Sequence, residues 1–98
     1  MNIKTSTNGD QANIKLADKF DYESVQTFRD AYLQHKDLKK FIIDFRDTEY
    51  MDSSGLGMLI NMRRELGEKS VKIQLRNCRP QIKKVLLISR FDKYFEIN

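Results

Sequence analysis

Short apolar runs of strand type alternate along this chain with longer segments whose apolar residues recur at helical spacing. The run Phe41-Ile42-Ile43-Asp44-Phe45 is aromatic and β-branched, which is typical of a central strand buried on both faces. Helical periodicity starts again at Asp52 and continues to about Gly67, where glycine suits the end of a helix. This alternation with short connections predicts an α/β fold in which helices pack on a mixed β-sheet.

The N-terminal part is predicted to form a β-hairpin followed by a helix. Asn2–Thr7 and Ala12–Ala17 alternate apolar and polar residues around the turn sequence Asn8-Gly9-Asp10. Asp21 can then cap a helix over about residues 22–35. The apolar residues expected on the buried side of that helix are Tyr22, Val25, Phe28, Ala31 and Tyr32.

The C-terminal part is predicted to add a strand, a helix and an edge strand. The first strand covers about Val71–Leu75, Pro80 begins a helix over about residues 80–89, and Tyr94–Ile97 can form the edge strand. The residues expected on one face of the helix are Ile82, Val85, Leu86 and Ser89. The order is therefore ββαβαβα, to which a last strand can be added, in a sheet of about four to five strands.

Length and composition limit what such a chain can be. Its 98 residues, 40% hydrophobic and 33% charged, suit one domain over residues 1–98 with a single core, which excludes a multidomain enzyme. The single cysteine, Cys78, cannot form an internal disulfide, and the start MNIKTSTNGD lacks a signal-peptide pattern. The longest apolar run, Val85–Ile88, is far shorter than the roughly 18 residues that span a bilayer. We expect a cytoplasmic protein without a membrane segment.

The positive charge lies in the second half of the chain. Residues 1–49 carry 8 Lys and Arg against 9 Asp and Glu, whereas residues 50–98 carry 10 against 5. Such an excess can attract an acidic partner, a nucleic acid or an anionic membrane, or it can be an ordinary solvated surface. A small nucleic-acid binder usually has a basic helix or aromatic residues among its Arg and Lys, and neither pattern is found. We therefore expect no direct contact with nucleic acid.

The start of the predicted second helix carries most of the functional information. Asp52 is a good N-cap, so Ser53 and Ser54 take the first two helical positions. On a helical wheel, Ser53 falls on the polar face, together with Gly57 and Asn61. The Ser53 hydroxyl is therefore predicted to face solvent.

Two glycines within this helix disfavour it by about 1 kcal/mol each relative to alanine. Gly57 lies on the same face as Ser53, where a missing side chain lets the backbone of a partner come close. Tight packing of Gly57 against a neighbouring loop is an equally good explanation. Met58 and Ile60 flank the polar face and can form the rims of a docking surface, although Ile60 can equally contact the core.

The motifs of common enzymes are missing around Ser53. A serine nucleophile needs a base, but the only histidine, His35, is at the end of the predicted first helix, and no Gly-x-Ser-x-Gly sequence is present. Gly55-x-Gly57 lacks the remaining residues of a phosphate-binding loop. We expect no catalytic residue, no cofactor and no metal site. The carboxylates near Ser53 are not spaced as the ligands of a metal ion usually are. These carboxylates are Asp44, Asp47, Glu49 and Asp52.

The segment Met51-Asp52-Ser53-Ser54-Gly55-Leu56-Gly57-Met58-Leu59, preceded by the strand at Phe41–Phe45, resembles the signature of STAS-domain proteins, the bacterial anti-sigma factor antagonists. The resemblance covers nearly the whole chain and is to the free-standing antagonists. Many members carry a Gly-x-Leu/Phe-Asp turn before the first helix, whereas this chain reads Asp18-Lys19-Phe20-Asp21 without the glycine. The resemblance implies that Ser53 is phosphorylated by an anti-sigma factor that is also a serine kinase.

The resemblance further implies a non-enzymatic switch that binds the anti-sigma factor when unphosphorylated and releases it when phosphorylated. A PP2C-type serine phosphatase would reset it. The alternative is a STAS adaptor that regulates another protein or enzyme without a sigma factor. The residues expected to contact the partner are Asp21, Asp52, Ser53, Ser54, Gly55, Gly57, Met58 and Asn61.

Overall fold

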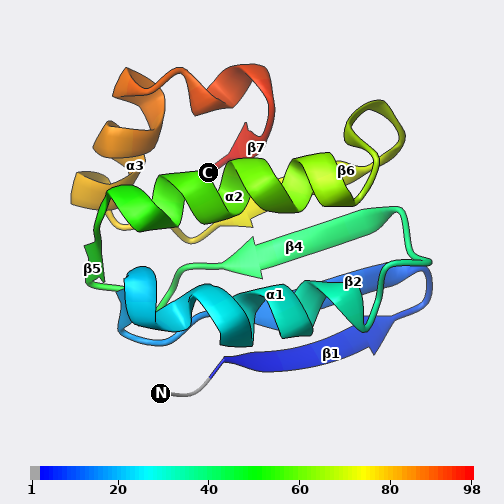
Figure 1. Cartoon of the computed structure of the whole chain (residues 1–98). Coiled ribbons are helices and arrows are strands. Elements are labelled where there is room, and N and C mark those ends of the chain that lie inside the picture. Colours follow the sequence, from blue (N-terminus) through cyan, green and yellow to red (C-terminus); the bar gives the residue numbers. More distant parts are fainter. Residues whose placement is uncertain (1–2) are drawn as a thin grey trace.

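The computed structural model describes residues 3–98, which build a mixed five-stranded sheet with helices (Figure 1). The strand order is β1-β2-β4-β6-β7, in which β1 is antiparallel to β2 and the other neighbours are parallel. The strands of this sheet are β1 (Lys4–Asn8), β2 (Gln11–Lys15), β4 (Lys40–Asp44), β6 (Lys72–Arg76) and β7 (Glu96–Ile97). The predicted α/β class and the central position of the Phe41–Phe45 strand are thereby confirmed.

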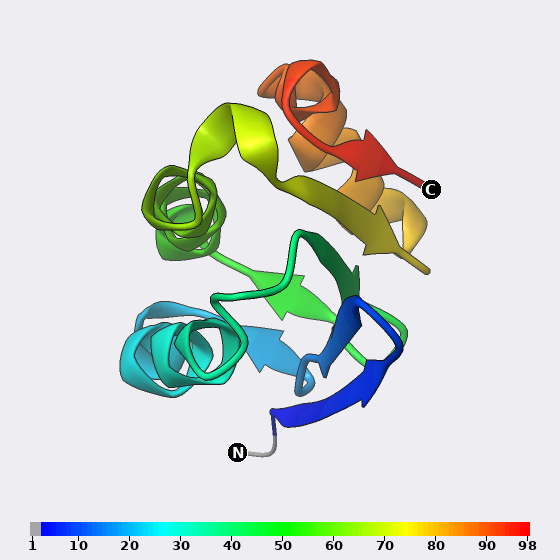
Figure 2. The ribbon, with the colours of Figure 1, turned by 90° about the vertical axis from the view of Figure 1, so that its right-hand side faces the viewer.

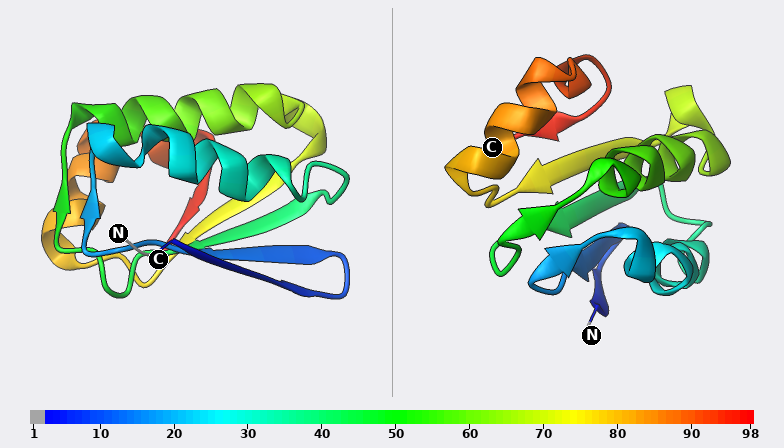
Figure 3. Two further views of the ribbon diagram at one scale, coloured as in Figure 1. Left: turned by 60° about the horizontal axis from the view of Figure 1, so that its bottom comes forward. Right: turned by 60° about the vertical axis from the view of Figure 1, so that its left-hand side comes forward.

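Three α-helices lie on one side of the sheet (Figure 3). Helices α1 and α2 run side by side and roughly along the direction of β4 (Figure 1), and α3 lies next to β6 and β7 (Figure 2). The helices are α1 (Val25–Leu33), α2 (Ser53–Glu65) and α3 (Pro80–Ile88), and three short 3₁₀ turns are η1 (Tyr22–Ser24), η2 (Glu68–Ser70) and η3 (Phe91–Lys93). Within residues 3–98, no helix is long and apolar enough to cross a membrane.

The core forms between the helices and the facing side of the sheet. Alternate residues of β2 and β4 are buried there, and they include Ile14, Phe41 and Ile43. Leu59 and Met62 of α2 are fully buried against them. Burial of these apolar side chains stabilises the fold and fixes α2 on the sheet.

The predicted elements are found, with changes at their edges. The first strand was predicted from Asn2, which lies outside the described residues, and the last strand is shorter than expected. Tyr22 and Val25 were expected in the core but are exposed. Tyr22 lies in the turn η1, and Val25 is the first residue of α1, at the end of the helix. Val85 is also exposed, because α3 contacts the core mainly through Ile82 and Leu86.

A second, very small sheet was not predicted. Strand β3 (Lys19–Phe20) pairs in parallel with β5 (Tyr50–Met51), and each strand leads directly to the start of a helix. The pairing places Phe20 opposite Met51. As a result, the N-terminal ends of α1 and α2 lie at the same end of the molecule (Figure 1).

Candidate functional site

The start of α2 has the geometry that its sequence predicts. Asp52 is extended, and its Oδ1 accepts hydrogen bonds from the backbone N–H groups of Ser54 at 2.9 Å and Gly55 at 3.3 Å. Ser53 is the first residue of the helix and is exposed, whereas Ser54 is half-buried. The carboxylate of Asp52 thus satisfies two helix-start amides and leaves the Ser53 hydroxyl open to solvent.

Asp21 occupies the equivalent position at the neighbouring helix start. It follows β3 as Asp52 follows β5, and its Oδ1 accepts a hydrogen bond from Glu23 N at 3.1 Å. Asp21 is buried, so its role in the structure is to cap η1. Because β3 and β5 are paired through Phe20 and Met51, the capping aspartates that directly follow them lie at the same end of this small sheet.

The two glycines of α2 have different surroundings. A Cβ atom on Gly55 would lie 2.5 Å from Met51 Cγ and 3.0 Å from Phe20 Cδ2, so Gly55 is the residue that needs to be small for packing. A Cβ atom on Gly57 would meet nothing within 4 Å. Gly57 is therefore on an open surface, and its predicted alternative role in packing against a loop is wrong.

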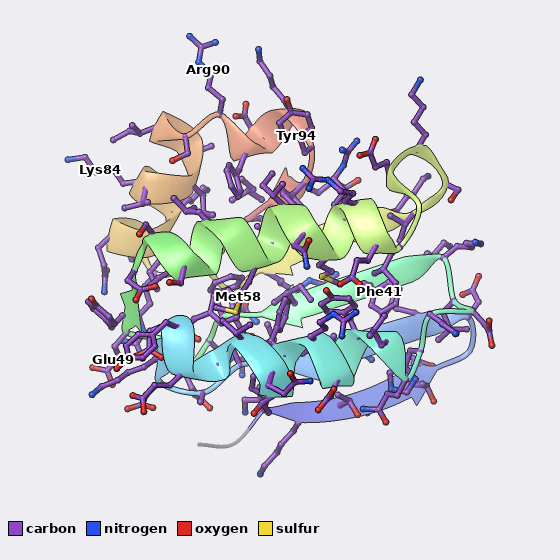
Figure 4. All side chains as sticks on the ribbon, viewed as in Figure 1. Phe41, Glu49, Met58, Lys84, Arg90 and Tyr94 are labelled. Carbon is purple, nitrogen blue, oxygen red and sulfur yellow. The ribbon has the colours of Figure 1, made fainter. Side chains whose placement is uncertain are left out.

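Met58 differs from its expected position at the rim of a docking surface. Its side chain is 8% exposed and belongs to the core, because it points to the sheet between α2 and its neighbours (Figure 4). Ile60 is partly buried against the core. Asn61 is exposed, as expected, and its Nδ2 donates a hydrogen bond to Glu65 Oε1 at 3.2 Å.

A polar cluster that was not predicted joins α1 to the last turn of α2. Arg29 donates two hydrogen bonds to the carboxylate of Glu65, from Nε at 3.1 Å and from Nη2 at 2.9 Å. The Tyr32 hydroxyl donates to the same carboxylate. The hydrogen bonds from Arg29 and Tyr32 lower the pKa of Glu65, while burial and the bond to Glu65 raise the pKa of Tyr32. This cluster fixes α2 relative to α1.

Exposed aromatic side chains stand beside the two helix starts. Tyr22 is 68% exposed and Tyr50 is 52% exposed, and both belong to the segments that the β3–β5 pairing brings together. Sequence reasoning missed them because Tyr22 was assigned to the core and β5 was not foreseen. A signal was available in the sequence, since Tyr50 lies just three residues before Ser53.

The structure separates the only histidine from Ser53. His35 follows the C-terminal end of α1, whereas Ser53 begins α2, and both helices start at the same end of the molecule (Figure 1). The nine residues of α1 place its two ends about 13 Å apart, so His35 is not within reach of the Ser53 hydroxyl.

The carboxylates near Ser53 have separate structural partners. Asp44 accepts hydrogen bonds from Arg46 N at 2.9 Å and from Asn77 Nδ2 at 3.0 Å, while Asp52 caps α2. Across residues 3–98, no group of three His, Cys, Asp or Glu side chains is arranged to hold a metal ion.

The fold and the exposed serine at a capped helix start define a STAS-type domain. A family profile described as "Mlab, STAS domain" matches residues 3–97, and the chain belongs to this STAS-domain family. It is 37% identical, over 95% of its own length and 93% of the relative, to a STAS-domain containing protein of Pseudomonas aeruginosa (strain UCBPP-PA14).

Three solved structures show the same fold. The unphosphorylated anti-sigma factor antagonist SpoIIAA has a TM-score of 0.77 at 22% identity, covering 99% of this chain and 87% of that one. The phosphorylated form of SpoIIAA, a Bacillus cell fate determinant, has a TM-score of 0.76 at 22% identity, covering 99% and 91%. An anti-sigma factor antagonist from Mycobacterium paratuberculosis has a TM-score of 0.80 at 16% identity, covering 98% and 83%. These likenesses establish the fold of the chain.

Proposed function

We propose that this protein is an anti-sigma factor antagonist that works as a phosphorylation-controlled interaction switch and not as an enzyme. Without phosphate it binds an anti-sigma factor that is also a serine kinase, and phosphorylation of Ser53 releases that partner. A PP2C-type serine phosphatase removes the phosphate, and the cycle takes place in the cytoplasm. Membership in the STAS-domain family and the shared fold with SpoIIAA support the proposal.

The observation that carries the proposal is the exposure of Ser53 at the first position of a capped helix. A kinase needs an accessible hydroxyl and space for its own backbone around it. Ser53 is exposed, and the nearby position Gly57 is open. The exposed rings of Tyr22 in η1 and Tyr50 in β5, at the helix-start end of the molecule, offer the apolar contacts that often dominate binding at such interfaces.

Phosphorylation would change binding through charge. A phosphate adds about −1.5 to −2 charges at neutral pH. The helix dipole and the helix-start amides tolerate a negative charge at Ser53, so the domain can stay folded. Exposed Glu49 adds a carboxylate at this end of the molecule (Figure 4), and exposed Glu23 lies in the turn η1. Binding of a partner surface that fits a neutral hydroxyl therefore becomes less favourable. Each 1.4 kcal/mol of lost binding free energy lowers the affinity for that partner about tenfold.

The test uses the purified chain as bait on a column, with Ser53→Asp as the second bait. The unmodified chain should retain a serine kinase of the anti-sigma type from the native cytosol, and the Ser53→Asp chain should retain at least about tenfold less. With Mg-ATP, the captured kinase should add one phosphate to Ser53, and Ser53→Ala should block it. Ser54→Ala is the matched control and should still be phosphorylated.

Gly57→Leu provides a second probe of the same interface. The position is open, so the variant should keep its melting temperature while a bulky side chain beside Ser53 obstructs the kinase. Labelling mainly at Ser54, or undiminished binding of both Ser53→Asp and Gly57→Leu, would contradict the proposal. Capture of a partner unrelated to sigma factors would favour the adaptor function instead.

A further inference from the structure

The face of the five-stranded sheet that points away from the helices is uncovered and carries opposed positive charges. Within the described chain, no helix lies over this face (Figure 3). The strand register places Lys4 of β1 opposite Lys15 of β2, and Lys40 of β4 opposite Lys72 of β6. All four are exposed and alternate with residues that are buried or, around Lys4, half-buried, so they share the outer face. Directly opposed like charges destabilise a sheet unless something compensates them.

Carboxylates in the protein compensate only part of this charge. Lys15 Nζ lies 3.4 Å from Asp47 Oδ2, and Lys40 Nζ lies 4.0 Å from Asp10 Oδ2. All four of these side chains are at least 45% exposed, and ion pairs between such exposed side chains contribute little to the stability of the fold. Within residues 3–98, Lys72 makes no ion pair.

Each pair of opposed lysines lines a hollow in the protein surface. Next to the Lys4–Lys15 pair lies a hollow of about 600 Å³, which Arg46 and Arg76 also line. Asp44 is its one carboxylate and already accepts two hydrogen bonds from the protein. Arginine offers paired N–H donors that match a carboxylate group.

The Lys40–Lys72 pair lines a second hollow of about 380 Å³, together with Lys93. Its carboxylates, Asp92 and Glu96, come from the segment around η3 and β7. The two hollows therefore lie towards opposite ends of β4, each next to one pair of opposed lysines.

The residues on this outer sheet face indicate which class of anionic ligand it can bind. None of the outward residues of β1, β2, β4 and β6 is aromatic, so the face lacks the rings that stack on nucleic-acid bases. Tyr94, at the edge of the smaller hollow, has its ring covered by the Arg63 guanidinium, 4.9 Å from the ring centre. The one large apolar outward residue, Ile42, is only 8% exposed, so the face offers no anchor for a membrane.

We propose that this outer sheet face is a second docking surface, which binds an acidic segment of a protein partner. The Lys4–Lys15 row and the Lys40–Lys72 row are four residues apart along the strands, or about 13 Å. The segment should therefore carry carboxylates with about this spacing. Helix α2 lies on the opposite face of the sheet, so the segment and the partner at Ser53 can be bound together.

The experiment titrates the full chain with a fluorescent poly-glutamate peptide and follows the backbone amides by NMR. The expected result is salt-sensitive binding with shifts in β1, β2, β4 and β6. The double variant Lys4→Gln/Arg76→Gln should bind at least about tenfold more weakly. It should melt at the same temperature as the unmodified chain or higher, since it relieves the Lys4–Lys15 repulsion. The matched control, Lys36→Gln/Lys84→Gln, loses the same charge away from this face and should bind within about twofold.

Three results would overturn the assignment. The first is that both double variants bind the peptide equally weakly, and the second is that the peptide shifts only amide signals of the helices. The third is that the chain binds poly-uridine RNA or phosphatidylserine vesicles more tightly than the peptide. Ser53→Asp should leave peptide binding unchanged, which separates this proposal from the one for the Ser53 site.

Discussion

Alanine at Gly55 should destabilise the domain, whereas alanine at Gly57 should stabilise it. At Gly55 a Cβ atom would lie 2.5 Å from Met51 Cγ and 3.0 Å from the buried ring of Phe20, so at least one of them must move. Overpacking of this kind typically lowers the free energy of unfolding by about 1–3 kcal/mol. The better helix propensity of alanine offsets up to about 1 kcal/mol of this loss. With the full gain subtracted, the expected net loss is up to about 2 kcal/mol. At Gly57 only the propensity gain applies, and it stabilises by up to about 1 kcal/mol.

Thermal and urea unfolding of the three proteins measure this difference. For a domain of this size, 1 kcal/mol corresponds to about 4–8 °C in melting temperature. Gly55→Ala should therefore melt several degrees below the unmodified chain and Gly57→Ala at or above it. A Gly55→Ala protein as stable as Gly57→Ala would show that Met51 and Phe20 do not pack against the start of α2, and the reasoning for the β3–β5 pairing would fail.

Two further predictions concern titrating groups. The lowered pKa of Glu65 means that its contribution to stability is present above its unfolded pKa of about 4.3 and is lost as the pH falls through the folded value. Glu65→Gln should therefore lower the melting temperature at neutral pH and flatten its acid dependence, while the control Glu68→Gln should do neither. Burial raises the pKa of Cys78 to about 11, so its thiolate near pH 8 should be about a hundredfold scarcer than in the unfolded chain. Reaction with a thiol reagent should be correspondingly slow in the native protein and fast in urea, and a rapid native reaction would contradict the burial.

Elements with strong local signals could be predicted from the sequence. Asp52 caps α2 as expected, because a carboxylate one residue before a helix satisfies amides within its own turn. Gly67 has a φ of 98°, a left-handed conformation that glycine adopts without strain at the end of a helix. The apolar run at Phe41–Phe45 gives the central strand, in which Phe41, Ile42 and Ile43 are all buried although helices cover only one face of the sheet.

Features that depend on distant contacts could not be predicted. Strands β3 and β5 have two residues each, too few for any periodicity, and they form because they pair with each other. The roles of Gly55 and Gly57 depend on neighbours from β3 and β5, which no helical wheel contains. The burial of Met58 likewise depends on the position of α2 over the sheet, because a methionine at the edge of a polar face can turn either way.

Under the proposed phosphorylation of Ser53, the same long-range contacts would hold α2 in place. At its N-terminal end, α2 is held by the packing of Gly55 on Met51 and Phe20, and at its C-terminal end by the hydrogen bonds of Glu65 to α1. A helix fixed at both ends cannot easily shift when its first residue gains a phosphate, and that position is compatible with negative charge. In the proposed switch, the free energy of the modification would therefore appear where the partner binds. It follows that a variant that loosens one end of α2 should reduce the effect of phosphorylation on binding.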